Sequence, residues 1–314
     1  MSKFLLTRLI TTLPVLLIVT FVVFGLVLLI PGDPAVTIAG PDATTEQVAA
    51  VRERLGLNDP VLIQYWNWLV SAVQGDLGTS LFTSRPVARS IADSLPVTLA
   101  LTAAAVLVSL VIAIPLAIVA ALRQGSWIDR LASLGSSVGI ALPSFWLGMM
   151  LVLLFSINLG VLPATGYVPL ADDPGQWARH LILPAITLGV AAAAESARQL
   201  RGSIIEVMKQ DYVRTARAKG LQGWVVIGKH VMKNASVPLV TVLGVQITFM
   251  LGGALLVEQV FGIPGMGMVA INAVTQRDIP VIQGIVLIAV LVAMIVNLLV
   301  DVTYGFLNPK VRPR

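Results

Sequence analysis

The sequence has no cysteine, two histidines and few charged residues. The absence of cysteine excludes disulfide bonds, thiolate metal sites and cysteine nucleophiles. Only 12% of the 314 residues are charged, whereas 57% are hydrophobic. So few charged residues cannot cover the surface of a water-soluble protein of this length, so we expect most of the chain to lie in lipid.

Motifs for nucleotide and metal binding are also missing. The sequence has no Gly-x-x-x-x-Gly-Lys-Ser/Thr run, so it lacks the loop and the lysine that hold nucleotide phosphates. It has no His-Glu-x-x-His motif, and its net charge of +5 is not arranged as a basic face interleaved with aromatic residues. We therefore expect no catalytic residue, no metal site, no cofactor and no nucleic-acid partner.

Long apolar stretches dominate what is present. Helices are indicated, because a backbone in lipid must satisfy its own hydrogen bonds and the alternation typical of barrel strands is not seen. Six stretches of roughly 20 residues are long enough to span a bilayer. They lie near Leu9–Ile30, Pro96–Leu122, Leu134–Leu159, Leu181–Leu200, Val237–Val260 and Val281–Phe306. The sequence predicts an all-α membrane protein with six transmembrane helices.

The positive charges predict the orientation of these helices. Fifteen of the 21 lysine and arginine residues fall before the first span, between the second and third, between the fourth and fifth, or after the last. Positively charged loops stay in the cytoplasm. We therefore expect a multi-pass protein with both termini and the segment 198–233 in the cytoplasm.

The predicted topology divides the chain into four parts. Residues 1–30 form the cytoplasmic N-terminus and first span, and residues 31–95 form an extracytoplasmic segment. Residues 96–306 form a five-helix core that carries a cytoplasmic segment at 201–236, and residues 307–314 form a cytoplasmic tail.

Two helices are expected in the outward-facing segment between the first and second spans, over Thr44–Leu55 and Val61–Gln74. Thr44 or Thr45 can cap the first helix. Asp59 can cap the second, with Pro60 at its first helical position.

The cytoplasmic segment reads as one helix from about Ser203 to Lys219, ended by Gly220. Tyr212, Ala216 and Gly220 are spaced by four and share one face, and the small residues would let that face approach another protein closely. A basic helix that binds anionic lipid head groups is the alternative interpretation.

The stretch 211–221 resembles the loop of ABC importer permeases that docks into the ATPase subunit. The family pattern is Glu-Ala-Ala, three residues and Gly, which corresponds here to Arg214-Thr-Ala216 and Gly220. Arginine in place of glutamate, and the late proline at Pro238, are typical of the peptide and nickel branch. The resemblance implies that a coupling helix is formed by Asp211, Tyr212, Val213, Arg214, Thr215, Ala216, Arg217, Ala218, Lys219, Gly220 and Leu221.

Shorter stretches resemble the same branch along nearly the whole chain, among them Gly75-Asp-Leu-Gly-Thr-Ser80, Glu258-Gln-Val-Phe-Gly-Ile-Pro-Gly-Met-Gly267 and Arg277-Asp-Ile-Pro280. The chain resembles the first of two permeases of a dipeptide or oligopeptide importer. A nickel or glutathione importer permease is the alternative within the family. An ion-coupled secondary transporter is disfavoured, because neither inverted repeats nor matching intramembrane charges are found.

The resemblance implies the type I ABC importer permease fold in the bacterial inner membrane, and a set of partners. These are a second permease, two ATPase subunits or one fused ATPase that bind ATP and Mg²⁺, an extracytoplasmic binding protein, a peptide and the surrounding lipid.

Other candidate contacts follow from polar and small residues in the spans, where a central charge costs about 2.5–3.5 kcal/mol. Glu258 is a candidate contact for the binding protein or for a peptide amino terminus. Gly252, Gly253 and Asp301 are candidate contacts with the second permease. Glu195 is expected to pair with Arg198, one helical turn away.

Overall fold

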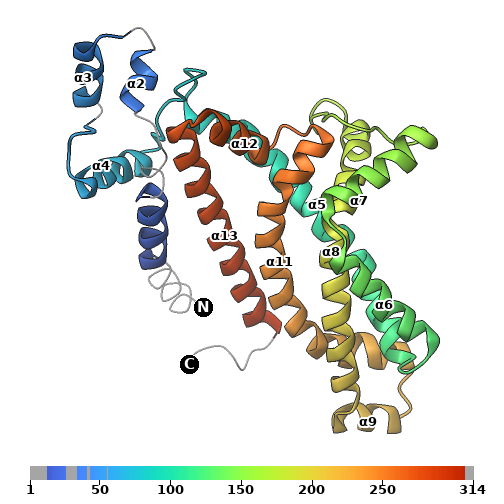
Figure 1. Cartoon of the computed structure of the whole chain (residues 1–314). Helices are drawn as coiled ribbons and strands as arrows, with labels where there is room; N and C mark the ends of the chain where they lie inside the picture. Colours follow the sequence, from blue (N-terminus) through green and yellow to red (C-terminus); the bar gives the residue numbers. More distant parts are fainter. Residues whose placement is uncertain (1–12, 26–33, 41–42, 55, 308–314) are drawn as a thin grey trace. The chain divides into compact units, whose positions relative to one another are not determined.

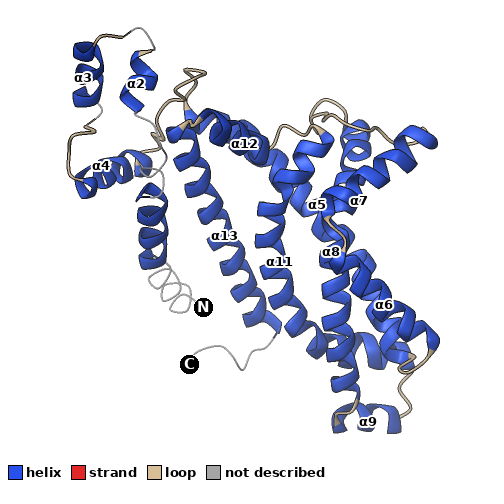
Figure 2. Ribbon diagram, in the orientation of Figure 1, coloured by secondary structure: helices blue, strands red, loops and turns tan. Residues whose placement is uncertain are grey.

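The structure is a computed structural model that describes residues 13–25, 34–40, 43–54 and 56–307. Every regular element in these ranges is a helix, and one isolated bridge joins Thr79 to Pro86 (Figure 2). The prediction of an all-α fold is confirmed. The described residues form two compact units, one of Thr98–Ile263 with the residues from Ile295 onward, the other of the residues up to Val97 with Pro264–Met294.

Four helical stretches of the described chain are long and apolar enough to cross a membrane by themselves (Figure 1). They are α5 (Val87–Leu122), α8 (Pro174–Met208), the stretch Gly223–Phe261 and α13 (Ile279–Leu307). They confirm the second, fourth, fifth and sixth predicted spans. Of the first, Leu9–Ile30, the helix Leu13–Gly25 is described and the remainder lies outside the described residues.

The third predicted span, Leu134–Leu159, is not one straight helix. It consists of α6 (Trp127–Ala141), α7 (Ser144–Leu151) and the π-helical stretch Val152–Asn158, with a bend of 103° between α6 and α7. Leu142 at the bend has φ −73° and ψ 125°. The bend follows from Pro143, because a proline lacks an amide donor and disfavours helical backbone in the residue before it.

Small residues on α8 allow close packing in the first unit. Helix α8 packs against α6, α7 and α11 (Met232–Phe261). Its buried face carries Gly189, Ala192, Ala193, Ala194 and Ala197. A Cβ atom on Gly189 would lie 2.7 Å from the carbonyl oxygen of Ala105 in α5. Only glycine permits this approach, and small residues at helix contacts are what drives association in lipid.

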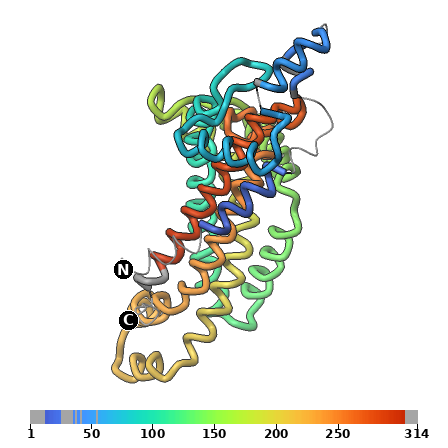
Figure 3. Tube along the Cα trace, turned by 90° about the vertical axis from the view of Figure 1, so that its left-hand side faces the viewer, coloured from blue at the N-terminus to red at the C-terminus, as the bar shows by residue number. Residues whose placement is uncertain are grey.

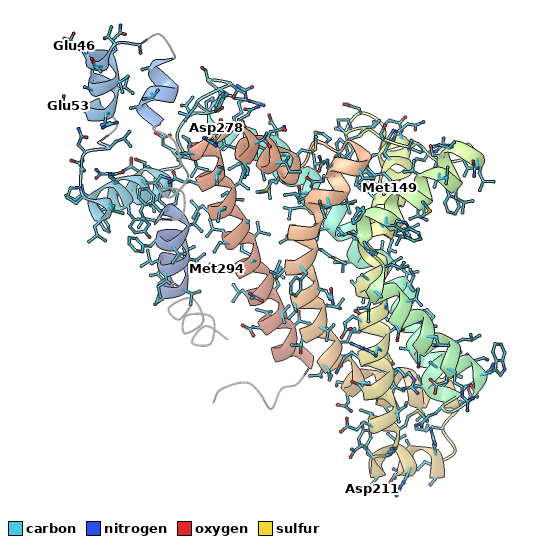
Figure 4. All side chains as sticks on the ribbon, viewed as in Figure 1. Glu46, Glu53, Met149, Asp211, Asp278 and Met294 are labelled. Carbon is cyan, nitrogen blue, oxygen red and sulfur yellow. The ribbon has the colours of Figure 1, made fainter. Side chains whose placement is uncertain are left out.

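The second unit includes α2 (Pro34–Ala39), α3 (Thr45–Arg54), α4 (Val61–Val73) and α12 (Met266–Gln276). Asp278, labelled in Figure 4 at the start of α13, binds the loop before α5. Its carboxylate accepts hydrogen bonds from the Ser80 hydroxyl at 2.5 Å and the Leu81 amide at 3.2 Å. Two of the short sequence stretches singled out above, around Ser80 and Asp278, therefore meet in space.

The helices expected at 44–55 and 61–74 are present as α3 and α4. Thr44 caps α3 as expected: its hydroxyl accepts from the Gln47 amide at 3.3 Å, and the Gln47 side chain accepts from the Thr44 amide at 2.9 Å. The prediction for α4 is wrong. Pro60 is itself the N-cap residue, with ψ 140°, so the helix begins at Val61 and Asp59 does not cap it.

We predict that Gly189→Ala lowers the stability of the protein by about 1–3 kcal/mol, because the added methyl group separates α8 from the backbone of α5. The measurement is thermal unfolding of the purified protein in detergent. Gly202→Ala is the matched control, because Gly202 lies on the same helix and a Cβ atom there would meet nothing within 4 Å. Equal unfolding temperatures for the two variants would contradict the close contact.

Candidate functional site

The connection between α8 and α11 reverses the chain through short helices (Figure 3). The single helix predicted from Ser203 to Lys219 is wrong, because α8 runs on to Met208 and a new helix, α9, spans Asp211–Ala218. Gln210 separates them with φ −70° and ψ 145°, which is extended backbone. Helix α9 then begins with an acidic residue, which the helix dipole favours in the first turn.

One face of α9 is buried in the chain's own core. Val213 and Ala216 lie in a cluster with Leu200 and Ile204 of α8 and Ala235 of α11. The prediction that Ala216 is open to another protein is therefore wrong. Its small side chain is used to pack α9 against the ends of α8 and α11.

Tyr212 and Gly220 were expected to share a face with Ala216. The Tyr212 side chain is 41% exposed, and its hydroxyl accepts a hydrogen bond from the Asn234 amide group at 2.8 Å. Gly220 has φ +77° and ends α9, as expected for a residue that must adopt the left-handed conformation.

The opposite face of α9 is exposed and basic. Asp211, labelled in Figure 4, stands at the start of the helix. The exposed residues of α9 and its end are Asp211, Tyr212, Arg214, Thr215, Arg217, Ala218, Lys219, Gly220 and Leu221. Arg214 and Asp211 are 3.5 Å apart and largely exposed, so their ion pair contributes little to stability. The helix thus presents three cationic side chains to solvent.

Glu258 lies in a different environment from the one predicted. Its side chain is fully buried near the end of α11, and it accepts a hydrogen bond from the Thr98 hydroxyl of α5 at 2.6 Å. The prediction that Glu258 contacts a binding protein or a peptide amino terminus is wrong for this structure. A buried carboxylate has to be hydrogen-bonded, and α5 supplies the donor.

Two glycines of α11 were predicted to contact the second permease, and they differ in exposure. A Cβ atom on Gly253 would lie 3.5 Å from Leu188 of α8, and Gly253 is half-buried. Its predicted contact with the second permease stays a prediction. Gly252 is exposed, and a Cβ atom there would meet nothing within 4 Å. It lies on an open stripe of α11 with Val245, Phe249 and Leu256.

Asp301 is half-buried on α13. The predicted contact of this carboxylate with the second permease stays a prediction.

An ion pair that the sequence analysis missed joins α6 to α8. Arg201 donates through Nε and Nη2 to the carboxylate of Asp129, with an Nη2 to Oδ2 distance of 2.6 Å. The Gly125 amide donates to the same carboxylate at 2.9 Å. The local sequence marks Asp129 only as the third residue after Ser126, which caps α6. It does not point to Arg201, which lies 72 residues further along the chain. The predicted pair of Glu195 and Arg198 is confirmed at 2.5 Å.

Sequence families account for nearly the whole chain. Residues 113–313 match the family described as binding-protein-dependent transport system inner membrane component. Residues 1–102 match the N-terminal part of binding-protein-dependent transport system membrane components.

Individual relatives and solved structures agree with these matches. Glutathione transport system permease proteins of Salmonella typhimurium and Escherichia coli K12 are 44% and 43% identical to this chain over 313 residues, 99% of each chain. The MetNI methionine ABC transporter, in an inward-facing conformation, has a TM-score of 0.57 at 14% identity over 70% of this chain and 96% of that one. The similarity to the solved structure shows the fold alone.

We predict that Val213→Ala makes α9 open more often, because two buried methyl groups are lost from the face that holds it. Amide hydrogen exchange over residues 211–218 should become about tenfold faster. Arg217→Ala is the control, because it removes an exposed side chain from the same helix. The same exchange rate in both variants would show that the buried face does not hold α9.

Proposed function

The chain belongs to the family of inner-membrane components of binding-protein-dependent transport systems. We propose that it is an ABC importer permease that conducts peptides delivered by a binding protein. We expect it to form the pathway together with a second permease. ATP and Mg²⁺ are then bound by two separate ATPase subunits or one fused ATPase. The charge distribution supports a topology with both termini in the cytoplasm.

Helix α9 is our proposed contact with the ATPase, and its position carries the proposal. The cluster that buries Val213 and Ala216 also contains residues of three spanning helices, namely Ala117 and Ala121 of α5, Leu200 and Ile204 of α8, and Ala235 and Leu239 of α11. Close-packed interiors transmit displacement instead of absorbing it. A movement of α9 would therefore reach all three spans at once, which suits a conversion between inward and outward access.

The exposed face of α9 indicates the chemistry of the partner. Arg214, Arg217 and Lys219 are exposed, against one acidic side chain at Asp211. We infer an acidic rim on the cleft of the ATPase, because complementary charges steer association and reject wrong partners. The exposed Leu221, immediately after Gly220, can enter an apolar part of the same cleft.

The substrate class rests on the sequence motifs and on the relatives. The motifs resemble those of dipeptide and oligopeptide permeases, so a peptide is the main proposal. Glutathione is the second candidate, because permeases named for glutathione transport are 44% identical over 313 residues. Both substrates are peptides chemically, and the binding protein is expected to set the choice between them.

We predict that the double substitution Arg214→Glu and Arg217→Glu lowers ATPase co-purification at least tenfold, because like charges would then face each other in the cleft. Thermal unfolding should not change, since both side chains are exposed. Arg130→Glu is the control, an exposed arginine of α6 outside α9. Unaltered co-purification and transport in the double variant would contradict the docking role.

Uptake by the purified complex in vesicles tests energy source and substrate together. We expect labelled di- and oligopeptides to accumulate only when ATP and the binding protein are both supplied. Accumulation of glutathione alone would favour the second candidate. Accumulation driven by an ion gradient without ATP would contradict the assignment to ABC importers.

A further inference from the structure

Helix α4 has an apolar side that is left open by the described part of the chain. Leu62, Trp66 and Val73 are 69%, 63% and 81% exposed. They are spaced by four and seven residues, so they follow one side of the helix over about three turns. The exposed Val70 lies on the same side. A continuous apolar surface of this kind marks a contact with a membrane or with another molecule.

A second side of α4 packs against the helix Leu13–Gly25. The ring of Tyr65 meets Phe21 and Phe24 of that helix edge-on, with ring centroids 5.2 and 5.7 Å apart. The Tyr65 hydroxyl also lies 2.9 Å from the hydroxyl of Thr20. These contacts fix α4 beside an apolar helix of the membrane component.

The same side of α4 lies beside the first residues of two spanning helices. Trp68 and Ala72 pack against a cluster that contains Val87, the first residue of α5, and Val281 and Ile285 in the first two turns of α13. Both α5 and α13 are long and apolar enough to cross a membrane. Helix α4 is therefore held at the level where these spans begin.

The third side of α4 is polar and turns toward the connection from α3. Gln64, Asn67 and Ser71 are spaced by three and four residues along this side. The Gln64 side chain donates to the carbonyl oxygens of Leu57 at 3.3 Å and Asp59 at 2.8 Å. Asn67 and Ser71 are exposed. The polar side thus faces the segment that precedes α4, and the open apolar side faces away from it.

We propose that α4 is an interfacial helix, which lies along the membrane surface with Leu62, Trp66 and Val73 inserted among lipid acyl chains. Helices with an apolar and a polar side lie in the plane of the interface, and tryptophan is enriched at that depth. No residue of α4 is charged, so insertion places no charge in lipid. By the predicted topology, the helix lies on the extracytoplasmic side.

Two observations favour lipid over a protein as the occupant of this side. The neighbouring helix Leu13–Gly25 also exposes apolar residues, with Ile18 63% and Val22 50% exposed, so the open side of α4 continues a surface that faces lipid. The open side also lacks the polar rim that is usual in protein interfaces. The indole N–H of Trp66 is its one side-chain donor, and it suits a lipid head group while the ring lies among acyl chains.

Spin labelling tests the proposal, because a chain without cysteine needs no background substitutions. Nitroxide labels are attached to the variants Leu62→Cys and Val73→Cys of the full chain in vesicles of phosphatidylethanolamine and phosphatidylglycerol. Asn67→Cys, on the polar side of the same helix, is the matched control. All three positions are exposed, so the substitutions remove no internal packing.

Collision of the labels with oxygen, which concentrates in lipid, and with a water-soluble nickel chelate gives their depth. We expect the labels at positions 62 and 73 to lie about 5–10 Å inside the boundary of head groups and acyl chains. The label at position 67 should lie outside this boundary and collide mainly with the nickel chelate.

Two results would overturn the proposal. Equal collision with the nickel chelate at positions 67 and 73 would show that the apolar side faces water. Shielding of positions 62 and 73 from both reagents, in the chain alone or after the partner subunits are added, would show that a protein covers this side. The measurement does not involve transport, so its outcome is independent of the proposed substrate.

Discussion

The close approach of helices along α8 is the constraint on which the first unit depends. Gly189 brings α8 against the backbone of α5, and Gly253 of α11 packs against Leu188 of α8. Lipid tails are as apolar as leucine, so helices in a membrane associate through close packing and not through exclusion of water. Residues without bulky side chains at these contacts therefore hold α5, α8 and α11 together.

The same close packing holds the short helix α9, between α8 and α11, against the ends of the long helices. Helix α9 is held by Val213 and Ala216, which lie in the same cluster as residues of three spans. The ion pair of Asp129 and Arg201 fixes the start of α6 to α8. If an ATPase docks on α9 as we propose, a force applied to the basic face of this helix would meet a rigid set of helix ends.

Local sequence signals were reliable where a property belongs to consecutive residues. Apolar runs located α5, α8, α11 and α13, Thr44 was one of two residues expected to cap α3, and Gly220 was expected to end a helix. They failed where burial depends on a distant partner. Glu258 looked accessible beside a glycine and proline turn, but Thr98, 160 residues away, meets it inside the protein.

The sequence by itself determined the membrane environment, the helical class and the family, because composition, hydropathy and the 211–221 motif need no knowledge of neighbours. Only the tertiary structure decided that Ala216 faces inward, that Gly252 stays exposed while Gly253 faces Leu188, and that Asp129 meets Arg201. A helical period predicts which residues share a face, but not which face finds a partner. That choice depends on contacts between helices that lie far apart along the chain.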